Sequence, residues 1–146
     1  IIALLVAALS QDGDRSGAGA AALAAAQAAE NRPMEARVVC DRMGSTQELN
    51  ACGALDLEQE QGRMQRYLEA AEVRAYESDN PERDYGETSQ SSAYLQASQA
   101  AWAAYADIRC KGVFDQWKDG SIRTIMNPGC MIDATRARTH DIWADT

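Results

Sequence analysis

The chain has 146 residues, the usual size of a single domain, and 46% of them are hydrophobic although only 6% are aromatic. Much of the apolar content is alanine, which buries little area per residue, so we expect a thin core that needs a further constraint. The net charge of −8 repels phosphate backbones and anionic lipid headgroups and attracts cationic proteins. Composition and charge therefore argue against nucleic-acid binding.

The chain opens with nine apolar residues, Ile1 to Leu9, whereas crossing a bilayer takes about twenty. They match the apolar region of a secretory signal peptide, and the small residues Ala8 and Ser10 permit cleavage before Gln11. The polar stretch "QDGDRSG" that follows disfavours the alternative, a short buried segment of the fold. We expect residues 1–10 to belong to a signal peptide. The mature protein would then be exported and without a stable membrane anchor.

Residues 11–38 are rich in alanine, and Leu23 is the large apolar residue of "SGAGAAALAAAQAAENRP". Alanine has the highest helix propensity, but a helix here has nothing evident to pack against, and isolated helices of this length are marginal in water. We predict a poorly packed linker, followed by a single helical domain over residues 39–146.

The first strong helix start is "STQE", where Ser45 and Glu48 have the spacing of a capping box. Apolar residues then recur at helical spacing and predict a helix from about 45 to 77. Gly53 and Gly62 each weaken it by roughly 1 kcal/mol relative to alanine. The stretch "ESDNPERDYG" contains proline and glycine and predicts a break after this helix.

A second helix is predicted from about 87 to 110, and it includes the alanine-rich stretch "LQASQAAWAAYADIRC". Residues at helical spacing form its expected inner face: Tyr94, Leu95, Ser98, Trp102, Tyr105 and Ile108. On an alanine-rich helix, neighbouring backbones can approach closely, so we expect Trp102 and Tyr105 to supply most of the buried area. The alternative role for this aromatic pair is ligand binding.

Two turn signals follow, at 118–121 and 127–129, and the second is expected to start a third helix that runs to the end of the chain. Arg138 falls on the inner stripe of that helix, where a charge needs a partner. We predict a buried bidentate pair with Glu60 or Asp107. Alternatively, the Arg138 stem lies on the core and its head stays in water. Because no segment has strand periodicity, the predicted fold is an all-α three-helix bundle.

The chain has four cysteines, Cys40, Cys52, Cys110 and Cys130, and an even number after an export-like leader predicts disulfides. Four cysteines allow three pairings, of which Cys40–Cys52 with Cys110–Cys130 is the most economical because each bond closes a local loop. Each such bond contributes about 3 kcal/mol. A zinc site needs close cysteine pairs, and the single His140 is not spaced as a partner, so we expect no metal and no cofactor.

Three stretches, "STQELNAC", "SQAAWAAYADIRC" and "GS…C…TRART", resemble the small helical domain named after the lysozyme inhibitor LprI. The resemblance covers about residues 40 to 142 and includes all four cysteines in order. Ala106 stands where the family pattern has arginine. Apart from the cysteines, the resemblance assigns structural roles in the family motif to Gln99, Trp102, Tyr105, Asp107, Thr135 and Arg138.

This resemblance implies a location and a partner. Because the family is common in secreted and periplasmic bacterial proteins, we expect the mature protein to be bacterial and periplasmic or secreted. Lysozyme inhibition is associated with some members of the family, and an acidic domain suits it because many lysozymes are basic and charge complementarity speeds encounter. The contact would lie on the disulfide-tied loop 111–129, with Phe114 and Trp117 as anchors and Ser121 reaching into a substrate cleft. The alternative is that Phe114 and Trp117 only cap the core.

The sequence offers no sign of an enzyme. Asp56, Glu58 and Glu60 lie among Gln and Arg, which is typical of a solvated helical face. One histidine without a paired nucleophile gives no catalytic triad, and no glycine-rich phosphate loop is present. We expect a non-enzymatic cell-envelope binding protein that inhibits a lysozyme. The alternative is a structural or interaction module of the envelope with another partner and no lysozyme inhibition. The oligomeric state does not follow from the sequence.

Overall fold

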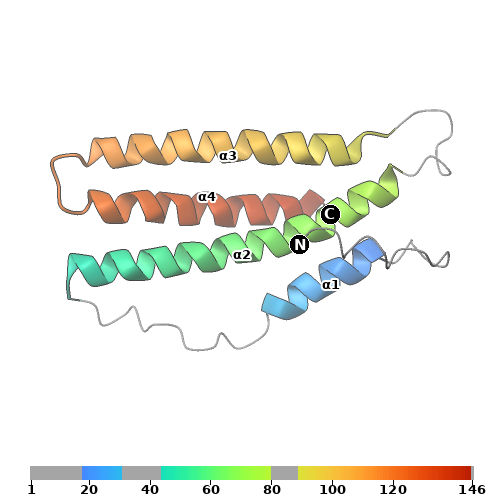
Figure 1. Ribbon diagram of the computed structural model, residues 1–146, viewed down its shortest axis with the longest axis horizontal. Helices are drawn as coiled ribbons and strands as arrows, with labels where there is room; N and C mark the ends of the chain where they lie inside the picture. The colour runs from blue at the N-terminus through green and yellow to red at the C-terminus, as the bar shows by residue number, and fades with distance from the viewer. Residues whose placement is uncertain (1–17, 31–43, 80–88, 146) are drawn as a thin grey trace, which may run out of the picture.

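The computed structural model describes residues 18–30, 44–79 and 89–145. Over these ranges the chain forms helices and no strand, so the all-α prediction is confirmed. The described part contains four helices, which corrects the expected three (Figure 1): α1 (Ala18–Glu30), α2 (Thr46–Ser78), α3 (Ser91–Gln116) and α4 (Arg123–Asp145).

The four helices lie side by side, with α4 between α3 and α2 (Figure 1). Helices α3 and α4 form an antiparallel hairpin, and α4 runs in the same direction as α2. Helix α1 packs against α2 on the side away from α3. Helix α4 is therefore an inner helix of the bundle, as is α2, which contacts each of the other described helices. None of the described helices is both long and apolar enough to cross a bilayer.

Helix α2 begins at the capping box that the sequence predicts. The Ser45 hydroxyl accepts a hydrogen bond from the Glu48 backbone N–H at 3.2 Å, and the Ser45 N–H donates to the Glu48 carboxylate at 3.0 Å. Two backbone groups that would otherwise lack partners are thus satisfied. The Ser45 hydroxyl also donates to this carboxylate, which lowers the pKa of Glu48. The helix continues without a break through Gly53 and Gly62.

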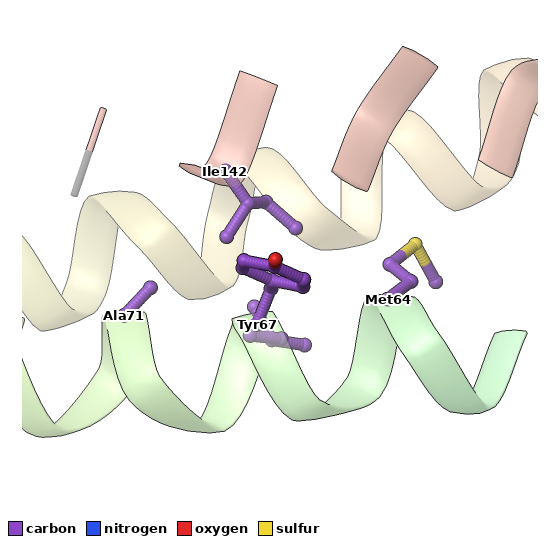
Figure 2. Packing of buried hydrophobic residues seen from close by; sticks show 5 residues of the cluster. Met64, Tyr67, Ala71 and Ile142 are labelled. Atoms are coloured by element: carbon purple, nitrogen blue, oxygen red, sulfur yellow. The ribbon is translucent and has the colours of Figure 1, made fainter. Parts of the chain in front are cut away.

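The apolar core joins one face of α2 to the end of α4. Its buried members are Met64, Tyr67, Leu68, Ala71 and Ile142 (Figure 2). The Tyr67 ring lies between the two helices and faces Ile142. Partly buried Leu23, Leu95 and Trp102 pack against the cluster from α1 and α3. This cluster is small for a four-helix protein, as the alanine-rich composition predicts.

Two threonines are buried in helix α4. Thr135 and Thr139 are 0% and 1% exposed. Each hydroxyl donates to a backbone carbonyl one turn earlier: Thr135 to Met131 at 2.7 Å and Thr139 to Thr135 at 2.8 Å. Helix α4 therefore satisfies these hydroxyls internally, and they need no polar partner on another helix.

Helix α1, in the segment predicted to be a poorly packed linker, is the helix that the sequence argument did not expect. Ala26 is 3% exposed against α2, and Leu23 reaches the core cluster. The sequence argument found no partner for this alanine-rich segment, but the small side chains let α1 approach α2 closely. Because alanines fill space poorly, a cavity of about 290 Å³ remains between the two helices. The assignment of residues 1–10 as a leader lies outside the described residues, and the boundaries of the linker and the domain remain predictions.

The inner face of α3 differs from the predicted one. Tyr94, Tyr105 and Ile108 are 70%, 62% and 70% exposed, so they do not belong to the core. The residues that turn inward instead follow a neighbouring stripe: Leu95, Gln99, Trp102, Ala106 and Cys110. Residues 91–106 contain no charge that would mark the outer face, so the periodicity alone did not distinguish the two stripes. Leu95 and the half-buried Trp102 belong to both.

Helix α4 begins at Arg123, before the start that the Asn127–Gly129 turn signal predicts. Pro128 lies inside the helix, where it lacks the N–H of a regular helical turn. Gly53 on α2 faces it, because a Cβ at Gly53 would lie 3.6 Å from the Pro128 Cγ. The Asn127 amide donates to the Cys110 carbonyl at 3.0 Å, so this dipeptide connects α4 to both neighbours.

Candidate functional site

The turn between α3 and α4 spans residues 117–122, much shorter than the predicted loop 111–129. Its backbone is closed by short-range hydrogen bonds, from the Gly120 N–H to the Trp117 carbonyl at 2.9 Å and from the Trp117 N–H to the Phe114 carbonyl at 3.3 Å. The predicted 118–121 turn signal falls within it. The remainder of the expected loop is helical, which leaves a compact convex end to the hairpin.

A disulfide joins the two helices behind this turn. Cys110 and Cys130 are bonded, with their Cα atoms 5.6 Å apart, and Cys110 is 0% exposed. This is one of the two bonds in the pairing favoured from the sequence. Cys52 is buried and also disulfide-bonded. Its expected partner Cys40 lies outside the described residues.

Large apolar side chains are exposed around the turn. Phe114 is 36% exposed, Trp117 42% and Ile122 40%, and Ser121 is also exposed. We call Phe114, Trp117, Ser121 and Ile122 the aromatic tip. The tip brings the three residues predicted for partner binding to one end of the hairpin.

The charges around the aromatic tip are mixed. Lys118 and Arg123 are basic, whereas Asp115 and Asp119 are acidic. The Arg123 guanidinium lies 5.3 Å from the centre of the Phe114 ring and donates to the Lys118 carbonyl at 3.1 Å. These contacts hold Arg123 in place over the ring. The basic and acidic residues balance at the tip, so the net negative charge of the chain lies on other parts of the molecule.

A second polar constellation joins α3 to α4. The Arg138 Nε donates to the Gln99 Oε1 at 2.9 Å, and the Arg138 Nη2 donates to the Ser98 Oγ at 2.8 Å. The Gln99 amide in turn lies 3.8 Å from the Met64 sulfur on α2. Gln99 and Arg138, two residues of the motif, are thus brought into direct contact.

The predicted ion pair of Arg138 with Glu60 or Asp107 is wrong. Glu60 pairs with Arg136 at 2.9 Å, and Asp107 pairs with Lys111 at 2.7 Å. Positions 136 and 138 are about 200° apart around a helix, so they face different neighbours. Helix α4 therefore directs Arg136 to the Glu60 carboxylate on α2 and Arg138 to amide and hydroxyl groups on α3.

The remaining motif residues separate into inner and outer positions. Trp102 packs against the core cluster, and Thr135 is buried in α4. Tyr105 and Asp107 are exposed on the outer side of α3. The structure therefore does not gather the motif into one site.

Asp79 links α2 to α3 through a helix cap that the sequence argument missed. Its carboxylate oxygens accept hydrogen bonds from the Ser91 and Ser92 backbone N–H groups at 2.7 and 2.8 Å. Asp79 follows α2 and so caps the start of α3. The hydrogen bonds from Ser92 and Ser91 hold the pKa of Asp79 well below its usual range. Local capping rules search the residue immediately before a helix, and they do not detect a cap supplied from the preceding helix.

The fold and these features define a small all-α protein with a disulfide-closed hairpin and an exposed aromatic turn. The chain belongs to the LprI family, because the family model described as lysozyme inhibitor LprI matches residues 40–142. The match begins before α2 and ends within α4, and it contains all four cysteines. The resemblance noted from the sequence is thereby confirmed. No curated protein and no solved structure matches the chain.

Proposed function

We propose that this protein binds and inhibits a lysozyme, without catalytic chemistry of its own, in the periplasm or outside the cell. The family supports this role through the inhibitor for which it is named. The observation that carries the proposal is the aromatic tip: Phe114 and Trp117 are partly exposed at a turn that the Cys110–Cys130 bond closes.

The aromatic tip has the properties of a binding anchor. Tryptophan and other large side chains supply most of the binding energy at protein interfaces, and a rigid segment loses little entropy when it binds. The tip is the convex end of a hairpin, a shape that complements the concave cleft in which enzymes hold their substrates. Trp117 would enter the cleft, with Ser121 beside it on the turn.

The net charge of the protein favours the diffusional encounter with a basic lysozyme more than it favours the contacts in the bound complex. A net charge of −8 attracts a basic lysozyme over distances beyond the contact surface. The tip itself is of mixed charge, so apolar contacts would dominate the bound state. Added salt should therefore slow association and change dissociation little.

A second candidate function is an interaction module with another envelope partner and no lysozyme inhibition. The outward face of α3 favours it, because Tyr94, Tyr105 and Ile108 are exposed there, away from the aromatic tip. Apolar side chains that gather on one helix face commonly mark an interaction surface.

The test is a titration of the oxidised full chain into lysozyme cell-wall lysis assays that cover several lysozyme types. We expect dose-dependent inhibition that Trp117→Ala weakens by about tenfold or more, since truncating a buried anchor removes most of its binding energy. Tyr105→Ala is the matched control, an exposed aromatic outside the tip, and should inhibit like the parent. Circular dichroism establishes that both variants fold.

Two results would contradict the proposal. One is the absence of inhibition with every lysozyme type, which would favour the interaction module. The other is equal inhibition by the Trp117→Ala and parent proteins, which would remove the tip from the interface.

A further inference from the structure

A cavity of about 350 Å³ lies at the end of the bundle opposite the aromatic tip. It is formed where the end of α2, the start of α3 and the end of α4 meet (Figure 1). Its volume is in the range of small-molecule sites. The lysozyme proposal makes no use of it.

Two arginines line this cavity, Arg74 from α2 and Arg138 from α4. The hydrogen-bond acceptors of Arg138 are the uncharged Gln99 and Ser98 side chains. Within the described ranges, Arg74 has no hydrogen-bond or ion-pair partner, and neither arginine pairs with a carboxylate. Two guanidinium groups that form no ion pair with any described carboxylate thus border one cavity, in a chain with a net charge of −8.

The unpaired guanidinium groups favour an anionic ligand. Arginine binds carboxylate and phosphate oxygens through its planar array of N–H donors. Arg138 uses Nε and Nη2 for its neighbours, and these bonds hold the side chain in a defined position at the cavity. Its Nη1 makes no hydrogen bond within the part of the chain that the structure describes. Arg74 is exposed and brings a whole guanidinium group.

The other residues that line the cavity indicate the chemistry of the rest of the ligand, apart from its anionic group. The lining includes the hydroxyl-bearing residues Ser78, Ser91 and Ser98 and the apolar residues Leu95 and Ile142. Sugars and hydroxy acids combine hydroxyl groups with C–H faces, and this combination matches both kinds of lining residue. Asp145 also borders the cavity and offsets part of the positive charge.

We propose that this cavity binds a sugar-sized, hydroxyl-bearing anion. Its carboxylate or phosphate lies between Arg74 and Arg138, and its body lies over Leu95 and Ile142. The proposal is independent of lysozyme inhibition, because the cavity and the aromatic tip are at opposite ends of the bundle.

Isothermal titration of the full chain tests this directly with D-glucuronate, glucose 6-phosphate, D-glucose and inorganic phosphate. We expect saturable binding of glucuronate or glucose 6-phosphate and much weaker binding of glucose. Comparing the two acidic sugars distinguishes a carboxylate from a phosphate ligand. Glucose binding as tight as that of both acids would overturn the anionic assignment. Inorganic phosphate binding as tight as glucose 6-phosphate would overturn the sugar-sized body, and the absence of saturable binding with both acids would overturn the site.

Variants locate the binding. Arg74→Gln should weaken binding of the acidic sugar by about tenfold or more, because it removes a charged hydrogen-bond donor. Arg109→Gln makes the same change at an exposed position on α3 outside the cavity and should have no effect. Asp145→Asn removes a negative charge from the cavity and should tighten binding about two- to fivefold. Equal affinities of the Arg74→Gln and Arg109→Gln proteins would overturn the proposed location.

Discussion

The two ends of the bundle are held together by different means. At the aromatic tip, the Cys110–Cys130 disulfide joins α3 to α4 and the Asn127 amide binds the Cys110 carbonyl. At the cavity end, the Asp79 carboxylate binds the first N–H groups of α3, and Ile142 packs against α2. The tip end is held by a covalent bond, whereas the cavity end is held by a helix cap and by apolar packing.

This difference follows from the side chains available at each end. Around the tip, the buried residues of α3 are Ala106 and Cys110, which offer little apolar area. At the cavity end, Tyr67 and Leu68 of α2 meet Ile142 of α4, so burial itself contributes stability. The covalent bond thus supplements a thin core at the tip end, where the two residues that α3 buries are small.

The largest expected effect is on the packed end. Ile142 is 2% exposed, and Ile142→Ala should lower the free energy of unfolding by about 2–5 kcal/mol because it opens space in a small core. The control Ile108→Ala changes a side chain that is 70% exposed and should stay within about 0.5 kcal/mol of the parent. Chemical denaturation measures both. Similar losses for the two variants would contradict the assignment of Ile142 to the core.

The next effect is on the covalent end. Replacing both Cys110 and Cys130 by alanine should cost about 3 kcal/mol, since the bond closes a sequence separation of 20 residues and restricts the unfolded chain. Thermal unfolding of the double variant under oxidising conditions measures this cost. A loss below about 1 kcal/mol would mean that packing alone holds this end, contrary to the comparison of the two ends.

The smallest expected effect is the pH dependence of the cap at the cavity end. The pKa of Asp79 is lowered in the folded protein, so its contribution is present above the pKa of an unfolded aspartate, about 3.9, and is lost as the pH falls below it. Asp79→Asn should make unfolding less sensitive to acid below about pH 5. Unfolding midpoints across this range measure the slope.

A matched variant separates the cap from general charge effects. Asp119→Asn removes an exposed carboxylate from the α3–α4 turn and should keep the steeper acid dependence of the parent. If the Asp79→Asn protein retained that same dependence, the cap would not contribute to it.

Interactions between residues that are near in sequence were sufficient to predict several features of the fold. The Ser45–Glu48 pair placed the start of α2, and the 118–121 signal lies within the turn between α3 and α4. The Cys110–Cys130 pairing follows from short sequence separation. In each case the residues that interact are near in sequence, so their spacing carries the information. The candidate tip residues Phe114, Trp117 and Ser121 were placed on the hairpin end for the same reason.

Features that depend on contacts with neighbouring helices could not be predicted from the spacing of residues in the sequence. The inner face of α3 was misplaced because its alanine-rich sequence presents similar stripes, and the contact with α4 selects between them. The start of α4 was misplaced because Asn127-Pro128-Gly129 is typical of a turn before a helix, whereas Pro128 lies inside α4 and faces Gly53 of α2. The sequence singled out Arg138, but its position beside Arg74 at the cavity was not predicted, because the two residues come from different helices.

The sequence by itself determined the helical class, the capped start of α2, the hairpin turn and the family. Each of these rests on contacts within a few residues or on a linear motif. The tertiary structure decided that α1 packs on α2, that Arg136 rather than Arg138 binds Glu60, and that Asp79 caps α3. Alanine-rich helices have faces of nearly equal hydrophobicity, so their orientation is settled only when the helices pack together and each polar group finds a partner.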